Sequence, residues 1–195
     1  MGPPKVALLP GSIRTASVNQ QLAAALVPLF ATRGVDAEVI DLDDYPMPLY
    51  HGDEEARHGQ PPAAVALHDR LAEVDGLIFV SPEYNGGPSA LLKNAIDWVT
   101  RVDRAVLKPL LIGLAAASPG PRGARNGLAV MRKIVEHLRL EIVDVDLSIP
   151  QYGDAFDLVD GVPTLVRVDD IEAAEAFVGG YAARLHQRVS VESAQ

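Results

Sequence analysis

Apolar residues gather in short runs that alternate with longer stretches of helical periodicity. Runs without polar alternation are typical of strands covered on both faces. The pattern predicts strands over 5–9, 35–42, 76–80, 110–115 and 140–147, the last as an edge strand. It predicts helices over 17–33, 63–73, 88–99, 128–138 and 169–187. Alternating strands and helices indicate an α/β fold: a doubly wound, five-stranded parallel sheet with helices on both faces, in a single domain over 1–195.

Two stretches interrupt this regular pattern. Pro28 lies inside the helix predicted over 17–33, where proline favours a kink or an early end. Residues 43–62 are rich in proline and glycine and predict a long loop. Such loops are often lids, binding loops or mobile segments. We interpret residues 45–60 either as a cover over a ligand, of this or a neighbouring subunit, or as an ordinary surface loop.

Composition narrows the classes of function. The chain has 195 residues and no cysteine, which excludes disulfides, thiolate nucleophiles and cysteine-ligated metal centres. Its 17 basic and 26 acidic residues give a net charge of −9, which disfavours nucleic acid and anionic membranes as partners. We see no secretory signal and no apolar run long enough to cross a bilayer, so we expect a soluble, cytoplasmic protein.

The loop after the first strand carries the most informative polar residues. Ligands of parallel sheets bind outside the carboxyl ends of the strands, and a helix N-terminus there suits an anion. Ser12, Ser17 and Asn19 offer hydrogen-bond donors, and Arg14 offers a permanent charge. These residues predict a phosphate site, with plain capping of the following helix as the alternative. The sequence fits neither a P-loop nor a nucleophile elbow.

Two further loops converge on the same edge of the predicted sheet. Residues 81–88 offer the flat face of Tyr84 and backbone groups that can contact a planar heterocycle, although a tight turn explains them equally well. Residues 116–123 begin small and apolar, and we interpret them as one wall of such a pocket. Arg122 and Arg125 in or after this loop could meet an anionic second ligand, or simply be solvated. The scattered histidines predict no metal site.

The stretch from Gly11 to Asn19, together with Pro82–Gly86 and Leu92–Trp98, resembles the NADPH-dependent FMN reductase family, which includes quinone, chromate and azo-dye reductases. The resemblance implies a flavodoxin-like fold, bound FMN, and NADPH or NADH as co-substrate. By motif position it implies phosphate contacts from Ser12, Arg14, Ser17, Val18 and Asn19. It implies contacts to the ring and ribityl chain from Pro82, Glu83, Tyr84, Asn85 and Gly86, with Ser118 near the ring. It also implies a homodimer or homotetramer.

We therefore expect an oxidoreductase in which hydride passes from NAD(P)H to bound FMN and then to a second acceptor in a ping-pong cycle. The acceptor would be a small molecule such as a quinone, a flavin, an azo dye or chromate. Because the cofactor performs the hydride chemistry, we assign no catalytic side chain. A flavodoxin-type electron carrier and a domain that binds another phosphate ligand remain as alternatives.

Overall fold

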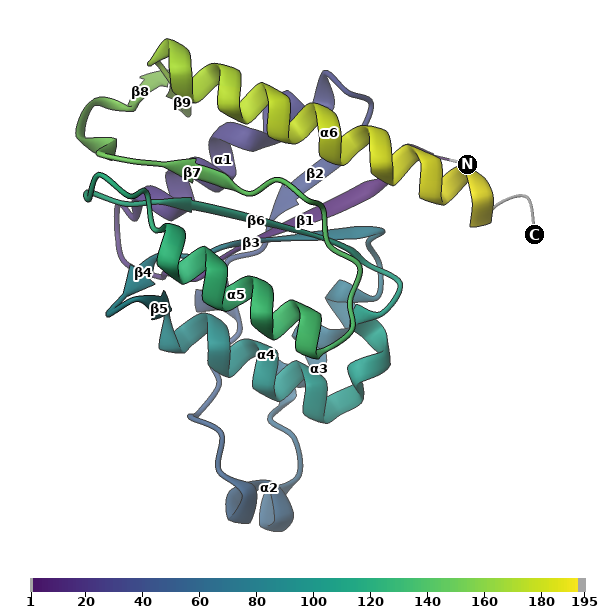
Figure 1. The fold of residues 1–195 in the computed structure, drawn as a ribbon. Helices are drawn as coiled ribbons and strands as arrows, with labels where there is room; N and C mark the ends of the chain where they lie inside the picture. Colours follow the sequence, from purple (N-terminus) through teal and green to yellow (C-terminus); the bar gives the residue numbers. More distant parts are fainter. Residues whose placement is uncertain (1, 193–195) are drawn as a thin grey trace.

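The computed structural model describes residues 2–192 and contains a five-stranded parallel sheet between two layers of helices (Figure 1). Its strands are β1 (Lys5–Pro10), β2 (Asp36–Val39), β3 (Gly76–Val80), β6 (Leu111–Ala117) and β7 (Leu147–Ile149). They lie in the order β2-β1-β3-β6-β7, with every neighbouring pair parallel. This is the strand order of the flavodoxin-like doubly wound fold, so the predicted fold class is confirmed.

Helices α1 (Val18–Ala31) and α6 (Val168–Glu192) cover one face of the sheet. Helices α3 (Pro62–Leu71), α4 (Ala90–Asp103) and α5 (Arg125–His137) cover the other face. Alternate residues of each strand point to opposite faces. In β1, Val6 and Leu8 pack in the core on the α1 side, and Ala7 and Leu9 in the core on the α4 side. Both faces are buried, which explains the uninterrupted apolar runs.

The predicted edge strand is shorter and later than expected. The structure has β7 at Leu147–Ile149, and the backbone of residues 140–146 pairs with β6 through one isolated bridge between Ile112 and Ile142. The reason is Arg132, which hydrogen-bonds to the Val143 carbonyl at 2.9 Å and pairs with Asp146. These contacts draw the chain away from β6 until Leu147.

The loop predicted over 43–62 contains helical structure. A 3-10 turn η1 (Leu42–Asp44) is followed by α2 (Gly52–His58), which stands away from the rest of the fold in Figure 1. Three acidic residues within the predicted loop, Asp53, Glu54 and Glu55, form the first turn of α2, where carboxylates interact favourably with the helix dipole. No residue of α2 is buried. We call residues 45–61 the arm.

Several other local features differ from the prediction. Pro88 does not begin a helix: it lies in β5 (Gly87–Pro88), which pairs with β4 (Glu83–Tyr84), and Ser89 caps α4. Pro28 does not end α1, which continues to Ala31. A hairpin of β8 (Phe156–Val159) and β9 (Val162–Leu165) was not predicted. The remaining elements are two 3-10 turns, η2 (Arg104–Leu107) and η3 (Tyr152–Asp154). None of the helices within residues 2–192 has the length and apolar character to cross a membrane.

Candidate functional site

A cavity of about 320 Å³ opens where β1, β3 and β6 end. Residues of all three predicted loops line it, so we call it the three-loop cavity. It contains nine of the eleven predicted site residues: Ser12, Arg14, Ser17, Val18, Asn19, Pro82, Glu83, Tyr84 and Ser118. The prediction that these sequence-distant loops meet at one edge of the sheet is therefore correct in geometry.

The first loop is shaped by tight backbone contacts. The Gly11 amide donates to the Val80 carbonyl at 2.9 Å, which joins the ends of β1 and β3. A Cβ on Gly11 would lie 2.8 Å from the Ser89 hydroxyl oxygen, so only glycine fits without displacement. Ala16 has a left-handed backbone with φ of 55°, and the Ser17 amide then donates to the Arg14 carbonyl at 2.9 Å. The chain thus turns sharply into α1.

The N-terminus of α1 is free to accept a ligand. Ser17 is the N-cap residue, but its side chain makes no capping hydrogen bond. The amides of the first helical turn have no acceptor inside the helix, and the dipole places partial positive charge there. No carboxylate within residues 2–192 forms an ion pair with the nearby Arg14 guanidinium. Free amides, a free hydroxyl and an unpaired cation along one cavity make a cradle for an anion, which favours phosphate binding over plain capping.

Asn19 is used differently from its predicted role. Its side chain is 2% exposed and forms two hydrogen bonds with the backbone of Ala117, the last residue of β6. The Asn19 Nδ2 donates to the Ala117 carbonyl at 3.1 Å, and the Oδ1 accepts from the Ala117 amide at 2.9 Å. The side chain therefore fixes the start of α1 against the third loop, while the Asn19 backbone amide remains at the open helix end.

Glu83 anchors the second loop to α5. Its Oε2 accepts from the Gly127 amide at 2.9 Å, and its Oε1 accepts from the Asn126 side chain at 3.4 Å. The carboxylate thereby caps a helix that follows it by more than 40 residues. A Cβ on Gly127 would lie 3.1 Å from the Cβ of Glu83, so this approach depends on glycine. Tyr84 follows, 55% exposed, on the rim of the cavity.

Two predicted site residues lie outside the cavity lining. Asn85 and Gly86 form the turn between β4 and β5, with φ angles of 52° and 79°. Arg122, also considered for an anionic ligand, is exposed and does not line the cavity either, and the same holds for Arg125. Within residues 2–192, no group of three or more acidic or histidine side chains is placed to hold a metal ion.

Tyr152 is the main lining residue that the sequence did not indicate. It lies in η3, and its amide donates to the Ser118 carbonyl at 3.4 Å. The Ser118 amide in turn donates to the Ile149 carbonyl at 3.1 Å. The sequence could have indicated Tyr152 only through its position shortly after β7, because that strand also ends at this edge of the sheet. Ala117 and Pro119, which complete the wall, lie inside the third predicted loop.

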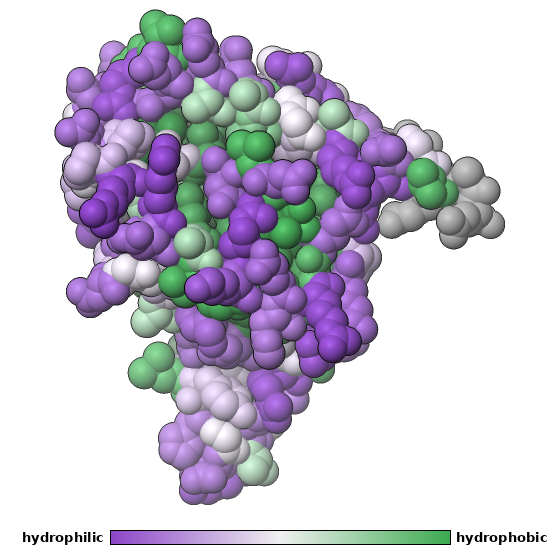
Figure 2. Space-filling model, in the orientation of Figure 1, coloured by the Kyte–Doolittle hydropathy of each residue, from purple (hydrophilic) through white to green (hydrophobic). Residues whose placement is uncertain are grey.

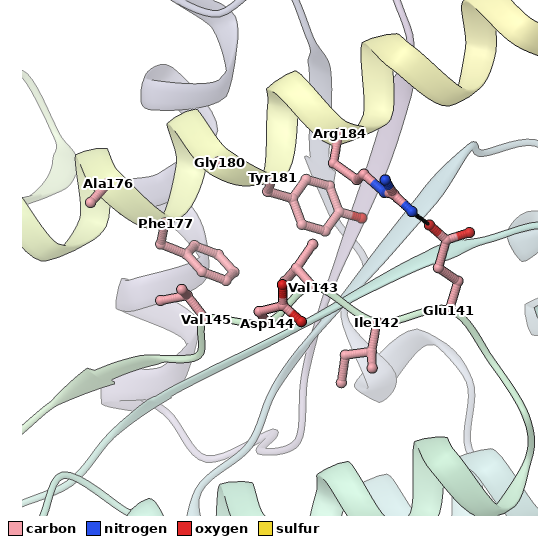
Figure 3. A pocket seen from close by; sticks show the side chains of 10 residues that line it. All are labelled: Glu141, Ile142, Val143, Asp144, Val145, Ala176, Phe177, Gly180, Tyr181 and Arg184. Atoms are coloured by element: carbon pink, nitrogen blue, oxygen red, sulfur yellow. Dashed lines mark hydrogen bonds and ion pairs between the residues drawn. The ribbon is translucent and has the colours of Figure 1, made fainter.

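A larger cavity of about 410 Å³ lies between α6 and residues 141–145, beside the start of β6 (Figure 3). Figure 2 shows hydrophobic surface in the hollow below α6, surrounded by hydrophilic residues. The Glu141 carboxylate in this cavity accepts two hydrogen bonds from Arg184, at 3.0 and 2.8 Å. The cavity includes no residue of the three loops, so we place the functional site elsewhere.

Comparison with known proteins identifies the family that the chain resembles along most of its length. Residues 4–154 match the family described as NADPH-dependent FMN reductase. An NADPH:quinone oxidoreductase of Arabidopsis thaliana is 39% identical over 99 residues, so the alignment spans 50% of this chain and half of that relative. An NAD(P)H-dependent FMN reductase of Pseudomonas aeruginosa is 35% identical over 146 residues, covering 73% of this chain and 71% of the relative.

A solved structure extends the comparison to nearly the whole chain. The flavoenzyme NAD(P)H:(acceptor) oxidoreductase FerB from Paracoccus denitrificans superimposes with a TM-score of 0.80 at 26% identity. The match covers 95% of this chain and 98% of that structure. Together with the family match over residues 4–154, these similarities show that the chain belongs to the NADPH-dependent FMN reductase family.

Proposed function

We propose that the three-loop cavity binds FMN and that the protein transfers electrons from NADPH or NADH to a small-molecule acceptor in a ping-pong cycle. Family membership supports the NAD(P)H-linked flavin oxidoreductase activity. One structural observation carries the assignment of the site: an uncapped helix N-terminus and the unpaired Arg14 line the same cavity as the loops suited to a flat ring. Quinones are our first choice of acceptor, because an aligned relative is named for them.

The phosphate end of FMN would lie in the first loop. The Ser12 and Ser17 hydroxyls, the backbone amides of Val18 and Asn19, and the Arg14 guanidinium would donate to it. Charge-assisted hydrogen bonds of this kind are roughly twice as strong as neutral ones. The backbone donors of this loop are held in place before the cofactor arrives, because the turn at Ala16 and the Asn19–Ala117 contact already fix the chain there.

The ring and ribityl chain would lie between the second and third loops. Pro82, Tyr84 and Ser118 would form the walls of the ring site, and Glu83 would hold the second loop against α5. Asn85 and Gly86 would approach the ring through their turn if the β4–β5 hairpin moved toward the cavity. Tyr152, which the sequence did not indicate, adds an aromatic wall on the side of β7.

Bound FMN would supply the hydride and electron chemistry. The protein contributes binding, orientation and an electrostatic environment. Its donors hold the phosphate, its loops fix the ring plane, and its open face admits the two substrates in turn. We assign no proton transfer to a side chain of the cavity, because the hydride chemistry belongs to the cofactor.

An anaerobic reduction experiment tests the proposal. The purified protein is loaded with FMN, freed of excess cofactor and mixed with NADPH or NADH while the visible flavin band is followed. We expect rapid bleaching, and recovery of the band when a quinone is added. Retained FMN that stays oxidised with both nucleotides would instead indicate an electron carrier. Failure to retain FMN would overturn the cofactor assignment.

We also propose that the protein forms a homodimer or homotetramer through the arm. The arm has no core of its own: no residue of α2 is buried, and the Leu49 side chain is 75% exposed. Isolated helices of this length are marginal in water, so contact with a second copy would stabilise it. Light scattering of the wild type and of Leu49→Asp tests this, and an unchanged mass for the variant would contradict a role for the arm.

A further inference from the structure

A second cavity adjoins the phosphate cradle on the side of β2. It has a volume of about 410 Å³ and is bounded by the first loop, α1, the end of β2 and Pro163 of β9. We call it the β2-side cavity. Arg14 and Ser17 line both this cavity and the three-loop cavity, so the two meet at the residues proposed to hold the FMN phosphate. Its volume is within the usual range for small-molecule pockets, roughly 300–1,000 Å³.

The walls of the β2-side cavity combine one acidic group with apolar surface. Asp41 follows β2, and its Oδ1 accepts from the Asp43 amide at 3.0 Å. Its other oxygen, Oδ2, forms no hydrogen bond within residues 2–192. Ala24, Val39 and Pro163 provide apolar wall. In dinucleotide-binding folds of the Rossmann type an Asp or Glu side chain accepts a hydrogen bond from a ribose hydroxyl, and Asp41 offers a carboxylate of the same kind in this cavity.

We propose that the β2-side cavity receives the adenylate half of flavin adenine dinucleotide, so that the protein binds FAD as well as FMN. This inference rests on the proposed FMN site. FAD is FMN extended by AMP through the phosphate, and the β2-side cavity begins at that phosphate. The second phosphate would remain beside Arg14, the ribose diol would reach Asp41, and the adenine would lie against Ala24, Val39 and Pro163.

The position of the cavity favours FAD over the ADP portion of NAD(P)H as its occupant. A nicotinamide that donates hydride must lie against the flavin ring, which the proposal places between the second and third loops. The β2-side cavity includes no residue of those two loops and joins the three-loop cavity only at its phosphate-binding residues. An extension of the flavin phosphate therefore enters it directly.

Two variants test the inference without altering the three-loop cavity. Ala24→Phe fills the β2-side cavity from α1, and Asp41→Asn removes the charge while keeping an oxygen for the Asp43 amide. Ala31→Phe, an exposed position at the end of the same helix, is the matched control. FMN and FAD are titrated separately into apoprotein, and their dissociation constants are measured from flavin fluorescence.

We expect the wild type to bind both flavins. Ala24→Phe and Asp41→Asn should each raise the dissociation constant of FAD by about tenfold or more, because each removes a contact with the adenylate half. The dissociation constant of FMN should stay within about twofold of the wild-type value. Ala31→Phe should change neither. Binding of FMN without FAD, or equal losses for both flavins in Ala24→Phe and Asp41→Asn, would overturn this inference while preserving the proposed function. Binding of neither flavin would overturn both.

Discussion

Asn19 and Ala117 are 98 residues apart in the chain, yet the Asn19 side chain satisfies both the amide and the carbonyl of Ala117. This single buried amide connects the helix that begins the phosphate cradle to the strand that ends at the ring loop. Besides the pairing of the strands, this side chain links the two halves of the proposed flavin site directly.

Replacing Asn19 with alanine should lower both stability and flavin affinity. The buried amide and carbonyl of Ala117 would lose their partners, which costs about 1–3 kcal/mol of unfolding free energy. Because the third loop would shift, FMN and riboflavin should lose affinity by the same factor. Urea unfolding and titration of both flavins check this. If only FMN were weakened, Asn19 would act on the phosphate directly and the positioning role would be wrong.

Replacing Arg14 with alanine should weaken FMN binding by about 10- to 100-fold, because a hydrogen bond to a charged group contributes about 1.5–3 kcal/mol. Riboflavin, which lacks the phosphate, should bind as before. Arg33→Ala is the matched control, since it removes the same charge near the other end of α1. Equal effects of Arg14→Ala and Arg33→Ala on FMN would point to general electrostatics rather than a specific phosphate contact.

Two glycine-to-alanine substitutions should have opposite effects on stability. Gly127→Ala places a Cβ 3.1 Å from the Glu83 Cβ, and we expect the cost of this overpacking, about 1–3 kcal/mol, to exceed the gain of about 0.5–1 kcal/mol that alanine brings inside a helix. Gly180→Ala, inside α6, meets no atom within 4 Å and should stabilise the helix by about 0.5–1 kcal/mol. Urea midpoints measure both changes. Stabilisation by both substitutions would mean that the β4–β5 hairpin moves freely and that Glu83 does not fix it.

The arm should loosen at acidic pH. The Glu55 carboxylate accepts hydrogen bonds from Arg101 at 2.9 and 3.0 Å, and Arg101 lowers the pKa of Glu55 below its usual value. A pKa lowered by folding means that this contribution is present above the ordinary carboxyl pKa of about 4.3 and is lost as the pH falls through the lowered value.

Trp98 offers a direct readout of the arm. It is the only tryptophan in the chain, donates to the Pro48 carbonyl at 2.7 Å and packs edge-to-face on Tyr50 with ring centroids 5.2 Å apart. Its fluorescence should therefore change as the pH falls through the lowered pKa of Glu55. Glu55→Gln should remove this transition and Glu54→Gln should retain it. An unchanged transition in Glu55→Gln would assign it to another group.

The parts of the fold that follow from local pattern were predicted from the sequence. The apolar runs at 5–9, 76–80 and 110–115 correspond to the three central strands, and their loops meet in one cavity. These runs are informative because each strand is buried on both faces. The family resemblance, carried by Gly11–Asn19, Pro82–Gly86 and Leu92–Trp98, is confirmed by the match over residues 4–154. The FMN contacts of individual residues stay a prediction.

The features that depend on tertiary contacts were not predicted. Arg132 displaces the edge strand, and no local pattern around 140–147 reveals its effect. The arm is fastened through Pro48, whose carbonyl accepts from both Asn94 and Trp98 on α4. Periodicity does not show such long-range hydrogen bonds. For the same reason the sequence indicated Asn19 as a phosphate donor and not as the partner of Ala117.

The strand order has a consequence for the order of events during synthesis. The first loop follows β1 and is therefore synthesised early. The three-loop cavity is also lined by residues that follow β3 and β6 and by Tyr152, so it is incomplete until those later segments have been synthesised. If the three-loop cavity binds the flavin as proposed, a nascent chain cannot form that site until most of its length has left the ribosome. The yellow colour of a flavin-loaded preparation would then report molecules in which the first loop and the segment around Tyr152 are already in contact with the same cavity.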